Sequence, residues 1–126
     1  MSYPADLKYT KEHEWIKIEG NKGTIGVTKY ALDQLGDVVY LDLPKLGTQF
    51  KAHDTFGTIE STKTVSDLYI PVTCKIVEVN GAMIDSPESL IQDPHTNGWL
   101  VKVEIIETPD NLLSASEYED YIKSHG

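Results

Sequence analysis

Apolar and polar residues alternate along the middle of the chain. The apolar residues share one parity: Leu68, Ile70, Val72, Cys74 and Ile76. A period of two residues is typical of a half-buried β-strand. Residues 56–59 can form a preceding strand, so the short polar segment 60–67 predicts the turn of a hairpin. This hairpin, about residues 57–80, is the stretch around which the remaining elements can be arranged.

Lys63 lies in the predicted turn, where its amine would be held out in water. Its neighbours are small or polar and would neither bury it nor pair with it tightly: Glu60, Ser61, Thr62, Thr64 and Ser66. A lysine that accepts a swinging prosthetic arm must be presented to a modifying enzyme on a projection of this kind. The alternative is an ordinary solvated lysine, since most lysines are exposed.

Short strands punctuated by Gly and Pro come before this hairpin. Glu14–Glu19 and residues 24–28 predict a first hairpin across a Gly-containing turn. Thr28 is placed to cap a short helix over Lys29–Leu35, which the following glycine would end. A strand over residues 38–43 and two shorter strands follow.

The last third of the chain predicts a helical turn, a strand and a terminal helix. The Ser-Pro pair at residues 86–87 is a start signal for one or two turns of helix. Alternating apolar residues over 99–105 predict a closing strand. Ser114 and Glu117 form a capping box at the start of a C-terminal helix, about residues 114–124.

These elements predict a mostly β fold, a β-sandwich or flattened barrel with short helices and a C-terminal helix. A chain of 126 residues can build one core and is too short for two ordinary domains, so we expect a single domain over residues 1–126. Residues 23–29 and 57–63 agree at five of seven positions, which is interpreted either as chance similarity between two strand-like pieces or as a quasi-symmetric pair of half-sheets. Lys29 is therefore a comparison for Lys63, because both lysines follow a similar local sequence but Lys29 leads into a predicted helix. If presentation on a turn decides which lysine is modified, we expect Lys63 to be modified and Lys29 not.

Net charge and composition narrow the function classes. The formal net charge is −9 and the chain contains no arginine. Nucleic-acid binding normally needs clustered basic residues, so we expect none. The acidic surface is interpreted either as a solubility feature or as a means of steering the protein toward basic partner enzymes. No apolar run approaches a membrane span, so we expect no membrane partner.

The single cysteine, Cys74, bears on the compartment. It cannot form an intramolecular disulfide and fits a reducing environment. By parity it faces inward, where we expect it to act as a small buried hydrophobe. The first residues lack the pattern of a secretory signal. We therefore expect a cytoplasmic protein of bacterial type, with a mature mitochondrial form as the alternative.

The sequence offers little for catalysis. Glu12, His13 and Glu14 form one polar cluster, and His53 with Asp54 forms another, but neither has the ligand spacing of a zinc site. No nucleophile motif and no phosphate-binding glycine loop is present. We expect a non-catalytic protein without a metal site.

The motifs around Lys63 resemble one known family. Residues 60–63, Glu-Ser-Thr-Lys, and residues 65–69, Val-Ser-Asp-Leu-Tyr, are similar to the lipoyl-lysine segment of glycine cleavage system H-proteins. The resemblance covers nearly the whole chain, with further similar stretches at residues 9–15, 34–39, 43–44, 98–102, 113–114 and 117–118. One departure is Cys74, where the family usually has Gly; it lies well after the acceptor lysine.

The resemblance implies a lipoyl carrier that shuttles an aminomethyl group in glycine cleavage. Lys63 would carry lipoic acid as an amide, within the lipoyl/biotinyl-carrier fold. The implied partners are a pyridoxal-phosphate glycine decarboxylase, an aminomethyltransferase that uses tetrahydrofolate, a flavin-containing dihydrolipoamide dehydrogenase and the enzyme that attaches lipoate. The protein would catalyse no step itself and would raise the effective concentration of the arm at each partner in turn.

Other residues are candidates for supporting roles. Those expected to help the lipoate-attaching enzyme recognise the turn are Glu60, Ser61, Thr62 and Asp67. Glu14 is a candidate partner for the amine of the loaded arm in a surface groove, and the alternative is an exposed acid at a strand end. Two other functions stay open: a carrier that relays lipoate or serves another multi-enzyme system, and an unmodified β-sandwich interaction module. A biotin carrier is disfavoured because Lys63 lacks flanking methionines.

Overall fold

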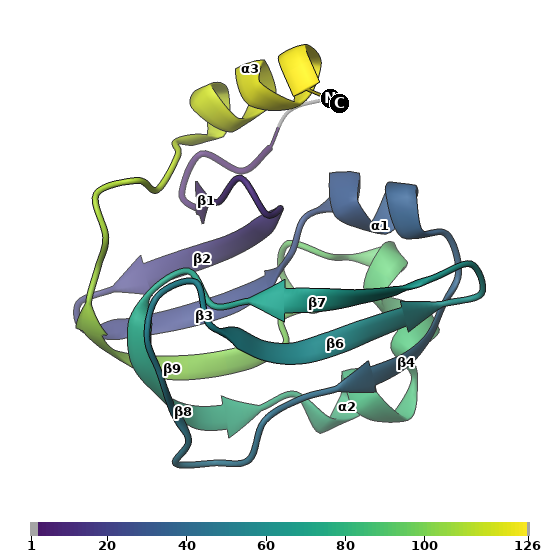
Figure 1. Ribbon diagram of the computed structural model, residues 1–126, viewed down its shortest axis with the longest axis horizontal. Coiled ribbons are helices and arrows are strands. Elements are labelled where there is room, and N and C mark those ends of the chain that lie inside the picture. The colour runs from purple at the N-terminus through teal and green to yellow at the C-terminus, as the bar shows by residue number, and fades with distance from the viewer. Residues whose placement is uncertain (1–2, 126) are drawn as a thin grey trace.

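The computed structural model describes residues 3–125, which form two antiparallel β-sheets with short helices. Sheet A contains β1 (Lys8–Tyr9), β2 (Glu14–Glu19), β3 (Lys22–Val27), β9 (Val101–Glu107), β8 (Thr73–Val79) and β5 (Gln49–Phe50), in that spatial order. Sheet B contains β4 (Val38–Asp42), β6 (Thr55–Ser61) and β7 (Val65–Tyr69), in that order. The helices are α1 (Lys29–Leu35), α2 (Gly81–Asp85), the 3₁₀ helix η1 (Pro87–Gln92) and α3 (Ala115–His125). The two sheets face each other, with α1 and α3 above them in Figure 1, which confirms the predicted sandwich.

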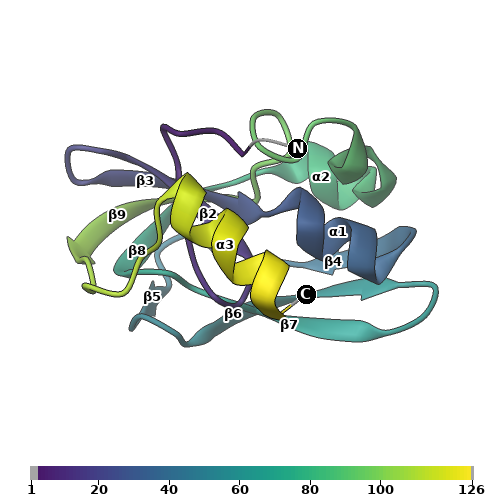
Figure 2. The ribbon, with the colours of Figure 1, turned by 90° about the horizontal axis from the view of Figure 1, so that it is seen from above.

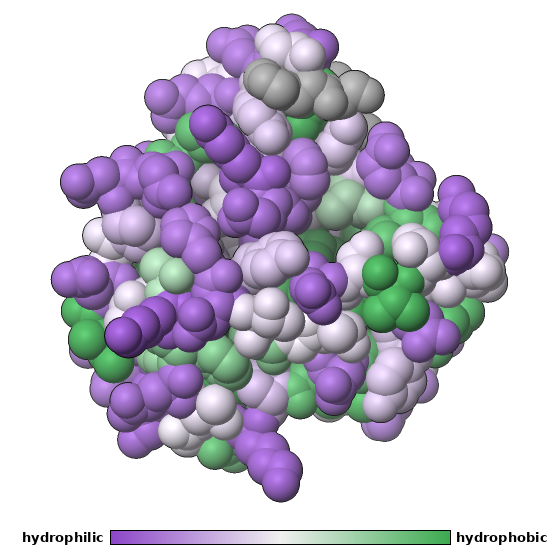
Figure 3. Space-filling view, viewed as in Figure 1, coloured by the Kyte–Doolittle hydropathy of each residue, from purple (hydrophilic) through white to green (hydrophobic). Residues whose placement is uncertain are grey.

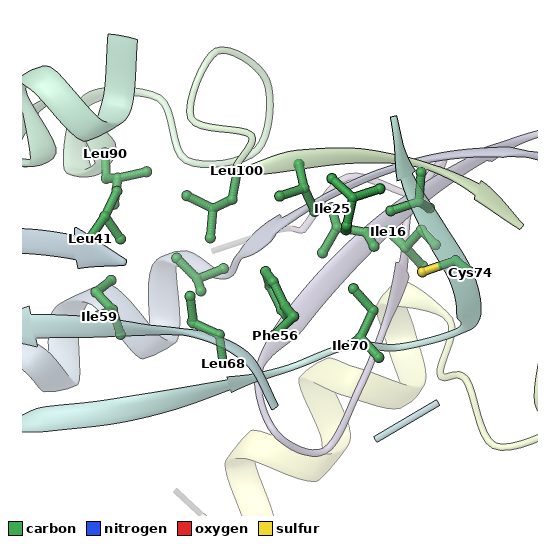
Figure 4. Close-up of a cluster of buried hydrophobic side chains, with 14 of the residues drawn as sticks. Ile16, Ile25, Leu41, Phe56, Ile59, Leu68, Ile70, Cys74, Leu90 and Leu100 are labelled. Carbon is green, nitrogen blue, oxygen red and sulfur yellow. The ribbon is translucent and has the colours of Figure 1, made fainter. Parts of the chain in front are cut away.

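Apolar side chains of both sheets fill the space between the layers. The five residues that share one parity in the central stretch are all buried, at 2% exposure or less: Leu68, Ile70, Val72, Cys74 and Ile76. Figure 4 shows Ile16 and Ile25 of sheet A at one end of this core, near Cys74, and Ile59 of sheet B at the other end. Burial raises the pKa of the Cys74 thiol to about 12, so this cysteine is the inert hydrophobe that its parity predicts.

The central stretch forms two strands in different sheets, and its prediction as one strand is wrong. β7 ends at Tyr69 in sheet B and β8 begins at Thr73 in sheet A, so the chain crosses between the layers at residues 70–72. Pro71 has no N–H to donate to a strand ladder, which favours a break at this point. The hairpin that carries Lys63 therefore spans Thr55 to Tyr69 and not residues 57–80.

The elements before the crossing follow the sequence signals closely. β2 and β3 pair from Glu14 opposite Val27 to Glu19 opposite Lys22, which confirms the first hairpin. The Thr28 side chain accepts a hydrogen bond from the backbone N–H of Ala31 at 3.3 Å and so caps α1. Gly36 ends the helix with φ of 85°, a conformation that favours glycine.

The elements after the crossing follow the signals in part. The segment after Ser86 is a 3₁₀ helix, and the Ser86 side chain makes no capping hydrogen bond. The preceding helix α2 was not predicted; the side chain of its N-cap residue, Asn80, makes no capping hydrogen bond and instead donates to the carbonyls of Asn97 and Trp99. The C-terminal helix is confirmed with its capping box: Ser114 N donates to Glu117 Oε1 at 2.9 Å, and Glu117 N donates to Ser114 Oγ at 3.2 Å.

A second cluster of buried side chains joins α3 to sheet A. Its members are mostly aromatic: Tyr3, Leu7, Tyr9, Trp15, Ala115 and Tyr118. The rings of Tyr9 and Tyr118 stack with their centroids 4.9 Å apart. Figure 2 shows α3 crossing above the strands with α1 beside it. Within the described part of the chain, no helix is long and apolar enough to cross a membrane.

Candidate functional site

Lys63 lies at the tip of the β6–β7 hairpin, in a turn built by Ser61. Ser61 N donates to the Thr64 carbonyl at 2.8 Å. The Ser61 hydroxyl accepts hydrogen bonds from Lys63 N at 3.2 Å and from Thr64 N at 3.1 Å. Ser61 is only 5% exposed, so its hydroxyl satisfies the turn's own N–H groups. The turn is thus shorter than the predicted segment 60–67.

The turn is fixed to the end of α1. Thr62 N donates to the Asp37 carbonyl at 3.0 Å, and Ser61 pairs with Val38 across the sheet. The Lys63 side chain lies against Gly36: a Cβ built on this glycine would stand 3.0 Å from Lys63 Cε and 3.5 Å from Nζ. Gly36 therefore ends the helix and also makes room for the stem of the lysine.

The two lysines of the sequence echo differ in the way that was predicted. Lys63 is exposed, and no ion pair to its amine is found within residues 3–125. Lys29 Nζ instead lies 2.9 Å from Asp33 Oδ2, one helical turn further along α1. An ion pair of this kind occupies the amine and restricts its motion. Of the two, Lys63 is the lysine whose amine is exposed and, within residues 3–125, without an ion pair.

A groove of about 290 Å³ runs between α1 and β7. One wall is formed by Ala31, Gln34 and Leu35 of α1, and the other by residues 66–68 of β7. The lining is completed by residues 12–14, which lie in the loop before β2 and at the first residue of that strand. In Figure 3 the recess between α1 and β7 shows green apolar surface, bordered on its left by purple polar residues. Lys63 is not itself part of the groove lining; its stem lies against Gly36, the residue after Leu35 of the α1 wall.

Glu14 is a buried carboxyl in the groove lining. It is only 2% exposed, so the alternative of an exposed strand-end acid is wrong. Its Oε1 accepts a hydrogen bond from Thr10 Oγ1 at 3.0 Å, and its Oε2 accepts one from Tyr69 N at 3.3 Å. Burial without a paired cation raises the pKa of Glu14 to about 8. An added positive charge in the groove would be stabilised by this group.

The candidate recognition residues are not gathered at one place. Asp67 is exposed and lines the groove together with Glu14. Glu60 lies in sheet B opposite Tyr40 and Val65, and all three of these side chains are exposed. The Thr62 side chain is exposed at the turn. Only Asp67 among the recognition candidates therefore reaches the groove.

The two polar clusters singled out in the sequence meet through one contact. Glu12, His13 and Glu14 all line the groove, which the sequence did not reveal. His53 does not line the groove, but its Nδ1 lies 3.5 Å from Glu12 Oε1 and its Nε2 lies 3.2 Å from Asn111 Nδ2. Within residues 3–125, no group of three or more His, Cys, Asp or Glu side chains is arranged to hold a metal ion.

The α1 wall of the groove was also missed by sequence reasoning. Tyr30 and Ala31 line the groove together with Gln34 because they lie four and three residues before it, the spacings that share a helix face. The available signal was the predicted helix itself, which placed small and polar residues on one side. Which partner element that side faces depends on the tertiary fold.

Two facing antiparallel sheets that present an exposed lysine on a hairpin, beside a groove with a buried acid, define a carrier domain of the lipoyl/biotinyl class. Comparison with known proteins identifies the family within this class. The chain belongs to the glycine cleavage H-protein family, whose model matches residues 7–125.

Individual relatives support this assignment over nearly the full length. The chain is 52% identical over 122 residues to the glycine cleavage system H protein of Symbiobacterium thermophilum, with 95% of each chain covered. It is 49% identical over 124 residues to that of Staphylococcus haemolyticus, covering 97% of this chain and 98% of the relative. The crystal structure of the glycine cleavage system H protein from Mycobacterium marinum superposes with a TM-score of 0.88 at 40% identity, covering 98% of this chain and 99% of that one.

Proposed function

We propose that Lys63 carries lipoic acid through an amide bond and that this arm shuttles an aminomethyl group from glycine decarboxylase to aminomethyltransferase. Membership of the H-protein family makes the chain a non-catalytic lipoyl carrier of glycine cleavage. The choice of Lys63 is supported by one observation above all: its exposed, unpaired amine at the tip of a hairpin that is fixed to α1. When attached, lipoate supplies a dithiolane that takes up the aminomethyl group as its disulfide is reduced.

The groove fits the needs of such an arm. Its volume of about 290 Å³ lies at the small end of ligand sites and suits a thin aliphatic chain. Apolar side chains such as Leu35 and Leu68 line it and would exclude water from the bound group. The loaded arm ends in an amine, and Glu14 offers the only carboxyl among the groove residues that is itself buried.

The Glu14 carboxyl can change its protonation state when the loaded arm binds. With a pKa of about 8, the carboxyl of the empty groove is protonated at neutral pH. A nearby cation lowers the pKa of a carboxyl, so arrival of the protonated amine would release this proton and leave a carboxylate–ammonium pair. The exposed Asp67 at the same groove would add a second, weaker attraction.

The partners follow from the same proposal. The protein works with the other components of the glycine cleavage system; we propose these to be glycine decarboxylase, aminomethyltransferase and dihydrolipoamide dehydrogenase, with a lipoate-attaching enzyme that modifies Lys63. Glu60, Thr62 and Asp67 present exposed polar groups near the lysine for recognition, whereas Ser61 contributes by shaping the turn. The bacterial origin of the relatives and the unpaired Cys74 support a cytoplasmic location.

The first test is the mass of protein produced in lipoate-fed cells. The wild-type chain is expected to gain one lipoyl increment, which peptide mapping should place on Lys63. Lys63→Arg keeps the charge and the fold and should abolish the increment, whereas Lys29→Arg should leave it intact. An increment on Lys29, or an unmodified chain in a host that lipoylates its own carriers, would contradict the proposal and favour an unmodified interaction module.

A further inference from the structure

The hydroxyl of Tyr118 joins three separate elements behind the groove. Tyr118 lies in α3 and is fully buried. Its hydroxyl is 2.8 Å from Nδ1 of His13, in the loop before β2, and 2.8 Å from Oγ1 of Thr28, the cap of α1. His13 and α1 contribute to the groove lining on its other side. This one hydroxyl therefore contacts residues that support two parts of the groove, the loop before β2 and the start of α1.

The hydrogen bonds that join Thr28, Tyr118 and His13 can be assigned in only one direction. Thr28 is fully buried, and its Oγ1 already accepts the N–H of Ala31. Among the described residues, Tyr118 is the only other hydrogen-bond partner of that oxygen, so the Thr28 proton has Tyr118 as its acceptor. A buried hydroxyl proton without an acceptor would be costly. Tyr118 must then donate its own proton to His13 Nδ1.

This chain of hydrogen bonds fixes the state of the histidine. A neutral ring that accepts at Nδ1 carries its proton on Nε2. Burial of the His13 ring lowers its pKa, with a smaller opposing effect of Glu12, so the neutral ring is favoured. His13 also has φ of 72°, and its backbone carbonyl accepts from Thr28 N at 3.0 Å, which holds the backbone in place as well.

We propose that Tyr118 is a positioning residue for the groove, which locks His13 in the Nε2–H tautomer and so gives the groove a fixed hydrogen-bond donor. The ligand class is the carrier's own arm, whose amide oxygen and sulfur atoms are acceptors. The part concerning the arm rests on the proposed function; the tautomer does not. Glu14 would then bind the cationic end of the arm, and His13 would donate a hydrogen bond to an uncharged acceptor atom of the arm.

Tyr9 provides a matched control within the same cluster. It is also fully buried, and its ring stacks on that of Tyr118. Its hydroxyl, however, donates to the Pro4 carbonyl at 2.7 Å and does not touch the groove residues. Tyr9→Phe and Tyr118→Phe thus remove the same group from neighbouring rings, and only the second removes the bond to His13.

The tautomer can be measured directly on the unmodified full-length protein. Long-range proton–nitrogen NMR of the chain labelled with ¹⁵N-histidine, assigned with a His13→Gln variant, should show His13 protonated on Nε2 with Nδ1 as an acceptor. Tyr118→Phe should shift the Nδ1 resonance, and Tyr9→Phe should leave it unchanged. A proton on Nδ1 in the wild type, or no response to Tyr118→Phe, would overturn the proposal.

The effect on the arm is measured with lipoylated, aminomethyl-loaded protein. Water converts the loaded thioether into a free thiol, formaldehyde and ammonia, and ammonia release reports the protection that the groove gives. Tyr118→Phe should accelerate release about fivefold, the factor expected for one neutral hydrogen bond, with Tyr9→Phe close to wild type. Equal release from both variants would refute the groove role. A wild-type chain that takes no lipoate would overturn the proposed function and the role of His13 toward an arm, while the NMR result on the tautomer would stand separately.

Discussion

At the scale of the residue, burial decides what Glu14 can do. Its carboxyl loses hydration in the groove, and the hydrogen bonds from Thr10 and Tyr69 offset this loss only in part, so its pKa rises from 4.5 to about 8. A carboxyl that titrates near neutrality can bind a cation and release a proton at little cost. The same residue on an open strand end would remain charged under all physiological conditions.

This raised pKa predicts a pH-dependent stability. The folded state binds a proton at Glu14 that the unfolded state has already lost, so the stabilising contribution is complete below about pH 4.5 and disappears as pH rises through about 8. Urea unfolding at about pH 7 and about pH 9 should show the wild type losing about 1 kcal/mol, and Glu14→Gln losing less. This window lies above the titration of His13 and His95, whose pKa values are lowered by burial.

Glu12→Gln is the control for this prediction. Glu12 is the neighbouring groove acid but is exposed, and its charge is only a lesser cause of the raised pKa of Glu14, so its removal should leave most of the pH dependence in place. A Glu14→Gln variant with an unchanged slope between the two pH values would show that Glu14 titrates in its ordinary range.

The sequence could predict the presentation of Lys63 but not the burial of Glu14. Lys63 is identified by its immediate neighbours, and turn chemistry is local. Glu14, Trp15 and Ile16 are consecutive and all buried, which breaks the alternation expected of a strand with one wet face. The reason is tertiary: the start of β2 is covered on both sides, by the core and β7 on one side and by the second cluster on the other.

At the scale of the element, the boundary between β7 and β8 was the main error. Leu68 and Cys74 share a parity because both face the same core, and alternation reports the face of a strand without reporting its sheet. Pro71 marks the crossing but did not by itself require one. The capped ends of α1 and α3 were predictable, because capping depends on residues three or four positions apart.

The pairing of β4 with β6 predicts an intolerance at Gly57. A Cβ at this position would clash with the Asp42 backbone carbonyl, because the two strands approach too closely for a side chain. Gly57→Ala should therefore lower the free energy of unfolding by about 3 kcal/mol and separate the strands beneath the lysine hairpin. Urea denaturation measures the loss.

Gly81→Ala is the matched substitution for this test. Gly81 begins α2, and a Cβ there meets nothing within 4 Å. Alanine should be neutral or stabilising by up to about 1 kcal/mol, as expected from helix propensity. If the two variants had equal stability, the close approach of β4 and β6 would not be a constraint.

At the scale of the whole molecule, we propose that residues 1–126 form one cooperative domain. The chain passes from sheet B to sheet A within residues 70–72, and β3 pairs with β9 across most of the sequence. Neither sheet is thus a continuous segment that could unfold alone. We predict that tryptophan fluorescence, which reports Trp15 in the second cluster and Trp99 packed against it, and far-ultraviolet circular dichroism will follow one coincident urea transition. Separate midpoints would indicate that α3 and its cluster unfold independently.

The position of β9 has a consequence for synthesis of the protein. β9 lies between β3 and β8 in sheet A, with Ile25 opposite Val101 and Lys22 opposite Glu104, although its residues come near the end of the chain. While the ribosome is still extending the chain, β3 has no partner on that side and sheet A stays open. The Lys63 hairpin is local and can form early, but the groove needs elements held by the completed sheet. Any modification that recognises the finished domain must therefore wait until β9 has left the ribosome.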